Sequence, residues 1–210
     1  MDFEYAGNEV PTNQEKKTLI NLDSETSRAI AAWLRDYLEN DIKAISDLSQ
    51  NLTDDPNQTE VNPKIAVTEA LTRIIGTIKN LYFAEKRNLK LMDGRAGWTL
   101  TFDKIPQNID QLSLNDIKPP RDGALNVDPE TSFALKNALS DTIVNPFHQI
   151  SFTTDLGISH DHHGQEAQKS PYEEIKKKAL EAGTKIFALT KMKQERISLK
   201  TAMGKTNLQV

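Results

Sequence analysis

The chain of 210 residues contains no cysteine, which excludes disulfide bonds, thiolate metal ligands and a cysteine nucleophile. It also lacks any run close to the ~18 consecutive apolar residues that a membrane-spanning helix needs. The acidic start, residues 1–5, is not followed by the apolar core of a secretion signal. We therefore expect a soluble protein without a membrane span, either cytoplasmic or exported without a cleavable signal peptide.

Signatures of catalysis are equally scarce. The glycine-containing segment 93–97 lacks the length and the Gly-Lys-Ser/Thr ending of a phosphate-binding P-loop. The serines do not stand in the glycine pattern of a nucleophile elbow. Asp54, Asp55 and Glu60 do not match the spacing of a calcium-binding EF-hand loop. These absences favour a protein that is not an enzyme.

Charge is distributed unevenly along the chain, although the net charge is only −4. Residues 1–64 carry 13 acidic and 6 basic side chains, whereas residues 170–210 carry 4 acidic and 9 basic ones. The simplest interpretation is that an acidic first helix and a basic last helix lie close together in one fold. Head-to-tail self-association, or a nucleic-acid or acidic partner for the basic end, are the alternatives.

Three long segments carry apolar residues at alternating spacings of three and four, which is the pattern of an amphipathic helix. The first begins at Asp23 or Ser24 and runs to about residue 52, the second covers residues 62–89, and the third covers residues 170–193. Stripes of this spacing can pack against each other at a shallow crossing angle. We therefore expect the second and third helices to lie side by side, as in a bundle or a short coiled coil.

A capping side chain followed by proline marks the start of three predicted helices, at Asn62-Pro63, Asp128-Pro129 and Ser170-Pro171. Within the last of these helices, Gly183 costs ~1 kcal/mol relative to alanine. A glycine beside an apolar stripe often permits the close approach of a neighbouring element.

Between the second and third long helices the pattern changes. Residues 89–92 and 98–102 alternate on either side of a glycine-containing turn of about five residues, which predicts a hairpin. A short helix is predicted from Pro129 to about Ile143, ended by Asn145-Pro146. The alternation over residues 149–153 predicts a third strand that joins the hairpin.

Together these patterns predict a mainly α protein, α+β in strict terms: a helical bundle with coiled-coil helices and a small antiparallel β insert. Residues 1–22 are expected to form a mobile N-terminal tail. Residues 23–200 are expected to form a single helical domain with the mixed insert at about 89–169, and residues 201–210 a frayed C-terminus.

The leading functional hypothesis is a non-enzymatic interaction or assembly protein, which self-associates or binds a helical protein partner through these stripes. It rests on the long amphipathic stripes and on the opposite charge of the two ends. The same stripes would serve an intramolecular contact equally well. The candidate partner-binding residues lie on the second and third helices: Leu71, Ile74, Ile78, Ile175, Ala182, Ile186 and Leu189.

The four histidines suggest an alternative function, because all of them fall within residues 148–163. Imidazole and carboxylate groups are ligands of zinc, manganese and iron. Against a metal site, most of these groups stand together in one polar segment, whereas metal ligands normally come from separate rigid elements. We expect no cofactor, with a small metal-dependent enzyme or metal-binding protein as the alternative; its candidate ligands are His148, His160, Asp161, His162 and His163.

The basic last helix suggests a third function, a nucleic-acid-associated accessory protein that contacts phosphates through lysine side chains. Glu173, Glu174 and Glu181 are interleaved with these lysines. Mixed charges at spacings of three and four favour ion pairs along the helix instead.

Overall fold

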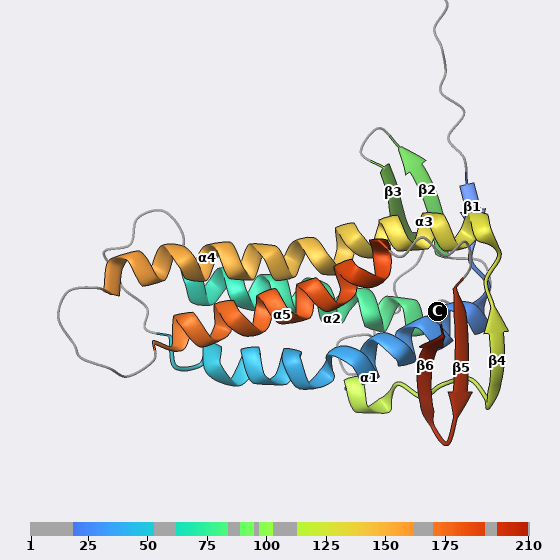
Figure 1. Ribbon diagram of the computed structural model, residues 1–210, viewed down its shortest axis with the longest axis horizontal. Helices are drawn as coiled ribbons and strands as arrows, with labels where there is room; N and C mark the ends of the chain where they lie inside the picture. Colours follow the sequence, from blue (N-terminus) through green and yellow to red (C-terminus); the bar gives the residue numbers. More distant parts are fainter. Residues whose placement is uncertain are drawn as a thin grey trace, which may run out of the picture.

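The computed structural model describes residues 19–52, 62–83, 89–94, 97–102, 113–161, 170–191 and 197–209. The protein is mainly α-helical with a small antiparallel β part, as the sequence predicts. Figure 1 shows the long helices side by side along the longest axis, with the strands gathered at one end. The apolar faces of the helices form one core between them. Within the ranges given, no helix combines the length and the apolar character needed to cross a membrane.

Helix α1 (Ser24–Ser49) is capped by Asp23, one of the two residues at which the sequence predicts its start. The Asp23 carboxylate accepts a hydrogen bond from the backbone N–H of Thr26 at 2.8 Å, which satisfies a donor that the first helical turn leaves without a partner. Ile30, Leu34 and Leu38 recur along one side of the helix and are buried. The predicted helix and its inner face are therefore confirmed.

Helix α2 (Pro63–Phe83) and helix α5 (Pro171–Lys191) also begin at the predicted prolines. At the start of α2, the Asn62 side chain accepts a hydrogen bond from the backbone N–H of Lys64 at 2.9 Å. Helix α2 ends at Phe83 and not at Leu89, which belongs to a strand.

From Pro129 to Asp161 the chain is one continuous helical segment. It consists of α3 (Pro129–Leu139), a π-helical turn η3 (Ser140–Val144) and α4 (Asn145–Asp161). Hydrogen bonds from the side chain and the backbone N–H of Thr131 cap α3 at Asp128 and lower the pKa of the Asp128 carboxyl.

Two predictions for this segment are wrong: the helix does not end at Asn145-Pro146, and residues 149–153 are helical and not a strand. Proline lacks an N–H, and in a regular helix its ring meets the carbonyl four residues earlier. Here the preceding turn is wider, because the N–H of Asn145 reaches back five residues to the carbonyl of Ser140. The wide turn makes room for Pro146 without ending the helix.

The long helices α1, α2, α4 and α5 form a bundle in which α1 packs against α2 and α5, and α4 packs against the same two helices (Figure 1). Helices α2 and α5 therefore lie diagonally opposite each other, and the prediction that they pack side by side is wrong. The spacing of apolar residues defines which face of a helix is apolar, but not which helix covers it.

The predicted proximity of the acidic first helix and the basic last helix is confirmed. Helices α1 and α5 are neighbours, and the Lys185 ammonium lies 2.9 Å from Oδ2 of Asp41. The hydrogen bond to Asp41 raises the pKa of Lys185. Opposite charge at the two ends of the chain thus contributes to contacts inside the fold.

The first sheet contains the predicted hairpin, β2 (Leu89–Gly94) and β3 (Gly97–Phe102). The strands pair as far as Gly94 and Gly97, so the connection holds two residues and not about five. The third strand is β1 (Leu19–Asn21), which pairs with β2, and the following Leu22 is buried. Residues 19–22 of the predicted mobile tail are therefore structured, whereas residues 1–18 lie outside the described residues.

The second sheet has the order β4 (Gly123–Asn126), β5 (Ser198–Ala202) and β6 (Lys205–Gln209). Strands β5 and β6 form a hairpin whose two turn residues, Met203 and Gly204, both have positive φ (53° and 76°). The C-terminal segment predicted to fray thus forms strands through Gln209, because its side chains pack onto α1.

Arg35 connects α1 to these elements at the end of the bundle. Its side chain is buried and donates hydrogen bonds to the carbonyl of Ile117, which follows the short helix η2 (Leu114–Asp116), and to the carboxylate of Asp36. The other Asp36 oxygen accepts the backbone N–H of Thr206 at 3.2 Å. The paired charges therefore join α1, the segment after η2 and strand β6.

Candidate functional site

The predicted partner-binding stripes lie inside the chain. The α2 residues Leu71, Ile74 and Ile78 are buried, as are Ile175, Ala182 and Ile186 of α5. All six belong to the one core that the bundle helices share. Leu189 lies within α5, but its side chain is outside the described residues. In the single chain, these stripes are covered by the chain's own helices.

Of the large apolar side chains that are exposed in the described residues, four lie on α4 and α5, and Tyr37, Ile65, Phe133 and Met203 lie elsewhere. On α4, Phe152 is 66% exposed and Leu156 46%. On α5, Leu180 is 42% exposed and Phe187 40%. Phe152 and Leu156 are four residues apart and Leu180 and Phe187 seven, so each pair lies on one side of its helix. We call these four residues the outer α4–α5 face.

Two contacts show which positions of α4 and α5 lie opposite each other. A Cβ atom placed on Gly183 would lie 3.3 Å from Cβ of Phe147 and 3.3 Å from Cδ2 of His148, so the two helices approach closely at this point. Nearly two turns further along α4, Asp155 forms an ion pair with Lys176. The predicted role of Gly183 in permitting a close approach is therefore confirmed.

The same two contacts place the exposed residues next to each other. On α4, positions 148, 152 and 155 share one side of the helix, and on α5 positions 176, 180 and 183 do the same. Because the helices run antiparallel between the two contacts, Phe152 and Leu180 lie at nearly the same level. They stand on either side of the line where α4 meets α5, and Leu156 and Phe187 lie further along the two helices in opposite directions.

Charged groups of both signs border this face on α5. Lys177 and Glu181 lie 4.0 Å apart on the solvent side of the helix, with 73% and 51% of their side chains exposed. An exposed pair of this kind contributes at most a few tenths of a kcal/mol to stability. Both side chains therefore remain available to groups outside the chain.

The predicted metal ligands are only partly within the described residues. His148 is exposed on α4 and packs over Gly183, and His160 and Asp161 form the end of the α4 backbone. The side chains of His160 and Asp161, and all of His162 and His163, lie outside the described residues. His160 stands twelve positions after His148 on the helix, roughly 18 Å along the axis, so one ion cannot bind both while α4 is continuous. Elsewhere in the described ranges, no three His, Cys, Asp or Glu side chains stand close enough to hold a metal.

The lysines of α5 have carboxylate partners at several positions. Lys176 pairs with Asp155, Lys177 with Glu181, and Lys185 with Asp41. Of these, the pairing of Lys177 with Glu181 at a spacing of four is the one that the mixed charges of the last helix predict. The others join α5 to neighbouring helices, which the sequence spacing does not indicate.

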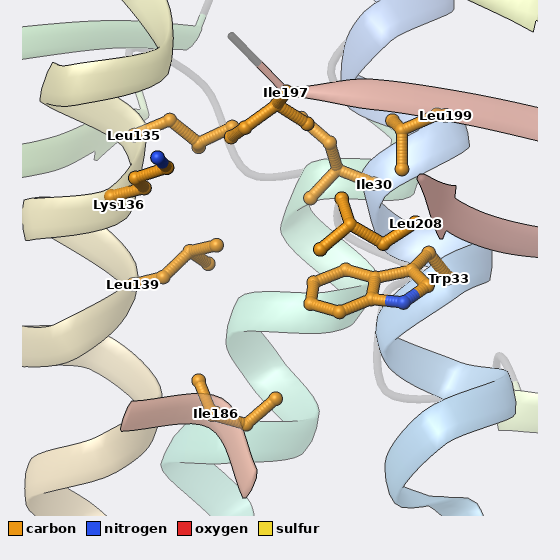
Figure 2. Close-up of a pocket in the computed structure, with 9 residues that line it drawn as sticks. All are labelled: Ile30, Trp33, Leu135, Lys136, Leu139, Ile186, Ile197, Leu199 and Leu208. Carbon is orange, nitrogen blue, oxygen red and sulfur yellow. The ribbon is translucent and has the colours of Figure 1, made fainter. Parts of the chain in front are cut away.

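The described residues also form hollows, two of which lie between helices of the bundle. A small apolar cavity of about 30 Å³ lies where α1, α3, α5 and the second sheet meet, and Figure 2 shows side chains such as Ile30, Trp33 and Leu139 around it. Apolar walls offer no hydrogen bonds, so this cavity is a gap in the core packing. A polar groove of about 510 Å³ lies between α2 and η3–α4, spanned by a 2.7 Å hydrogen bond from Arg73 to Gln149. It is lined by amide, hydroxyl and charged groups without a nucleophile paired to a base.

Comparison with known proteins yields no relative: no family model, no curated protein and no solved structure matches this chain.

Sequence reasoning missed the outer α4–α5 face. The alternation of residues 149–153 predicted a strand, although it extends over only five positions. Because of this prediction, Phe152 was not considered as part of a helical face. The signal was present, because His148, Phe152 and Leu156 recur every four residues. On α5, the sequence analysis predicted the apolar stripe that is buried, but it did not include Leu180 or Phe187.

Proposed function

We propose that this protein is a non-enzymatic interaction protein whose outer α4–α5 face binds an amphipathic helix of a protein partner. The observation that carries the proposal is the gathering of Phe152, Leu156, Leu180 and Phe187, all between 40% and 66% exposed, on two adjacent helices. Single exposed apolar residues are common on proteins, whereas contiguous ones mark contact surfaces.

The shape and chemistry of the face favour a helical partner. Two antiparallel helices in contact leave a shallow depression along the line between them, and an apolar helix stripe with anchors every three or four residues fits along such a line. Phe152 is the candidate anchor, because aromatic side chains contribute most to binding when a partner covers them. The border residues Lys177 and Glu181 supply charges of both signs at the rim.

Site-specific photo-crosslinking tests this function. A photoreactive phenylalanine analogue at position 152 should give discrete covalent products when cells that make the protein are irradiated. Position 133 on α3 is the matched control, because Phe133 is 62% exposed but lies outside the outer α4–α5 face. It should give weaker or different products.

A second variant tests whether the crosslinked products at position 152 depend on the outer α4–α5 face. Leu180→Asp adds a charge beside position 152 at a site that is already 42% exposed, so the fold should persist while the products at 152 disappear. Circular dichroism and thermal unfolding verify the fold. Identical products from positions 152 and 133, or products at 152 that survive Leu180→Asp, would contradict the proposed function.

A further inference from the structure

We propose that a second copy of this chain covers the outer α4–α5 face, arranged about a two-fold axis that passes beside Phe152. The inference rests on the proposed function, because it names the occupant of the same face. In this arrangement α4 lies antiparallel to the α4 of the second copy, and α5 antiparallel to its α5. Such an interface uses the same surface twice, so every contact occurs in two copies.

The level of the axis follows from the packing of α4 on α5. Position 148 lies opposite 183, and position 155 opposite 176. Because residue numbers rise in opposite directions on the two helices, position 152 lies opposite 179. An axis at the level of Phe152 on α4 is therefore at the level of Ala179 on α5.

With the axis at the level of Phe152, apolar residues of the face lie opposite apolar or aromatic groups of the second copy. Phe152 meets the same residue of the second copy, and aromatic pairs of this kind contribute to binding beyond the area that they bury. Leu156, four residues after Phe152, lies opposite position 148, where the exposed edge of a histidine ring packs over Gly183. Phe187, eight residues after Ala179, lies opposite the apolar Pro171.

The charges on α5 are self-complementary about the same level. Lys177 and Glu181 stand two residues before and two residues after Ala179. In an antiparallel pair, Lys177 of each copy therefore lies opposite Glu181 of the other, which gives two ion pairs that flank the apolar centre. Opposite charges with a common midpoint are frequent on helices. Here their midpoint coincides with the level of the most exposed apolar residue of the face, and this coincidence indicates a second copy and not an unrelated helix.

Charge exchange tests the arrangement. The oligomeric state of the full chain is measured by analytical ultracentrifugation across a concentration series, at low and at high salt. Wild type should form dimers. Lys177→Glu and Glu181→Lys each place like charges opposite each other in two places, so each should weaken dimerisation about tenfold or more.

The double variant Lys177→Glu/Glu181→Lys restores opposite charges and should recover dimers. An equimolar mixture of the two single variants should form mixed dimers, because every facing pair is then of opposite sign. Lys43→Glu, a charge reversal at an exposed position on α1, is the matched control and should dimerise as wild type does.

A wild-type chain that stays monomeric at the highest concentration overturns the inference, as does a dimer that the single variants leave unchanged. Crosslinking at position 152 separates this failure from that of the proposed function. Products between 152 and a different protein, together with a monomeric wild type, would refute the second copy and retain the interaction face. Absence of both dimers and specific products would refute both.

Discussion

Helix α5 presents two apolar faces that differ in what covers them. Ile175, Ala182 and Ile186 face the core and are buried, whereas Leu180 and Phe187 point outward and remain about 40% exposed. Both sets recur at helical spacing, so periodicity does not distinguish them. The difference teaches that a stripe becomes core or contact surface according to which helices the rest of the chain places beside it.

The largest expected effect comes from truncating one residue on each face. Ile175→Ala removes a fully buried side chain and leaves a cavity, so the free energy of unfolding should fall by about 2–5 kcal/mol. Leu180→Ala removes a side chain that is 42% exposed and should cost less than about 1 kcal/mol. Urea unfolding followed by circular dichroism measures both. Equal losses would show that the outward residue is as fully packed as the inward one.

The close approach of α4 and α5 at Gly183 can be tested by comparing alanine at this position with alanine at Gly76. A Cβ at Gly76, in the middle of α2, would meet no atom within 4 Å, so Gly76→Ala should raise the free energy of unfolding by about 1 kcal/mol through helix propensity. Gly183→Ala gains the same propensity, but its Cβ lies 3.3 Å from Cβ of the buried Phe147. Because that atom is fixed to the α4 backbone, the gain should be lost or reversed.

The two alanine variants should therefore differ from each other by roughly 1–2 kcal/mol, with Gly76→Ala more stable than wild type and Gly183→Ala no more stable than wild type, measured by urea unfolding under one set of conditions. Two equal gains would mean that α4 and α5 can separate slightly without cost, and the close approach at Gly183 would then lose its structural role.

The smallest expected effect concerns the side of α5 that faces α1. Lys185→Gln removes the ion pair with Asp41, in which the lysine is 44% exposed, so the loss at neutral pH should be about 0.5 kcal/mol. The pKa of Lys185 is raised in the fold above its ordinary value of 10.5. The ion pair therefore stabilises fully from neutral pH up to about 10.5, and its contribution falls as the pH rises through the higher folded pKa.

Thermal unfolding over a pH series measures this difference. Wild type and Lys185→Gln should converge in stability at strongly alkaline pH, while Lys43→Gln, at an exposed position on α1, should match wild type throughout. A gap between wild type and Lys185→Gln that is independent of pH would point to lost packing of the lysine stem in place of the ion pair.

Local signals in the sequence predicted local structure well. The cap at Asp23 and the proline starts at Pro63, Pro129 and Pro171 all lie where helices begin, because capping satisfies backbone groups within a few residues of the same segment. The β2–β3 hairpin was predicted for the same reason, since its two strands are close in sequence.

Several features that depend on contacts between distant parts of the chain were not predicted from the sequence. Strand β1 pairs with residues about seventy positions later, and β5 pairs with β4 across the whole of α5, so neither short strand was separable from a mobile tail. Pro146 was a sound local reason to end a helix, but packing of α4 on α2 and α5 stabilises the continuous helix with its wide turn.

By itself, the sequence determined which faces of the helices are apolar, where the helices begin and how opposite charge is divided between the two ends of the chain. Only the tertiary structure decided that α2 and α5 are diagonal, that their stripes share one core, and that Phe152 and Leu180 stand together outside it. The physical reason is that hydrophobic burial is not directional: covering an apolar stripe stabilises the fold, whichever element covers it.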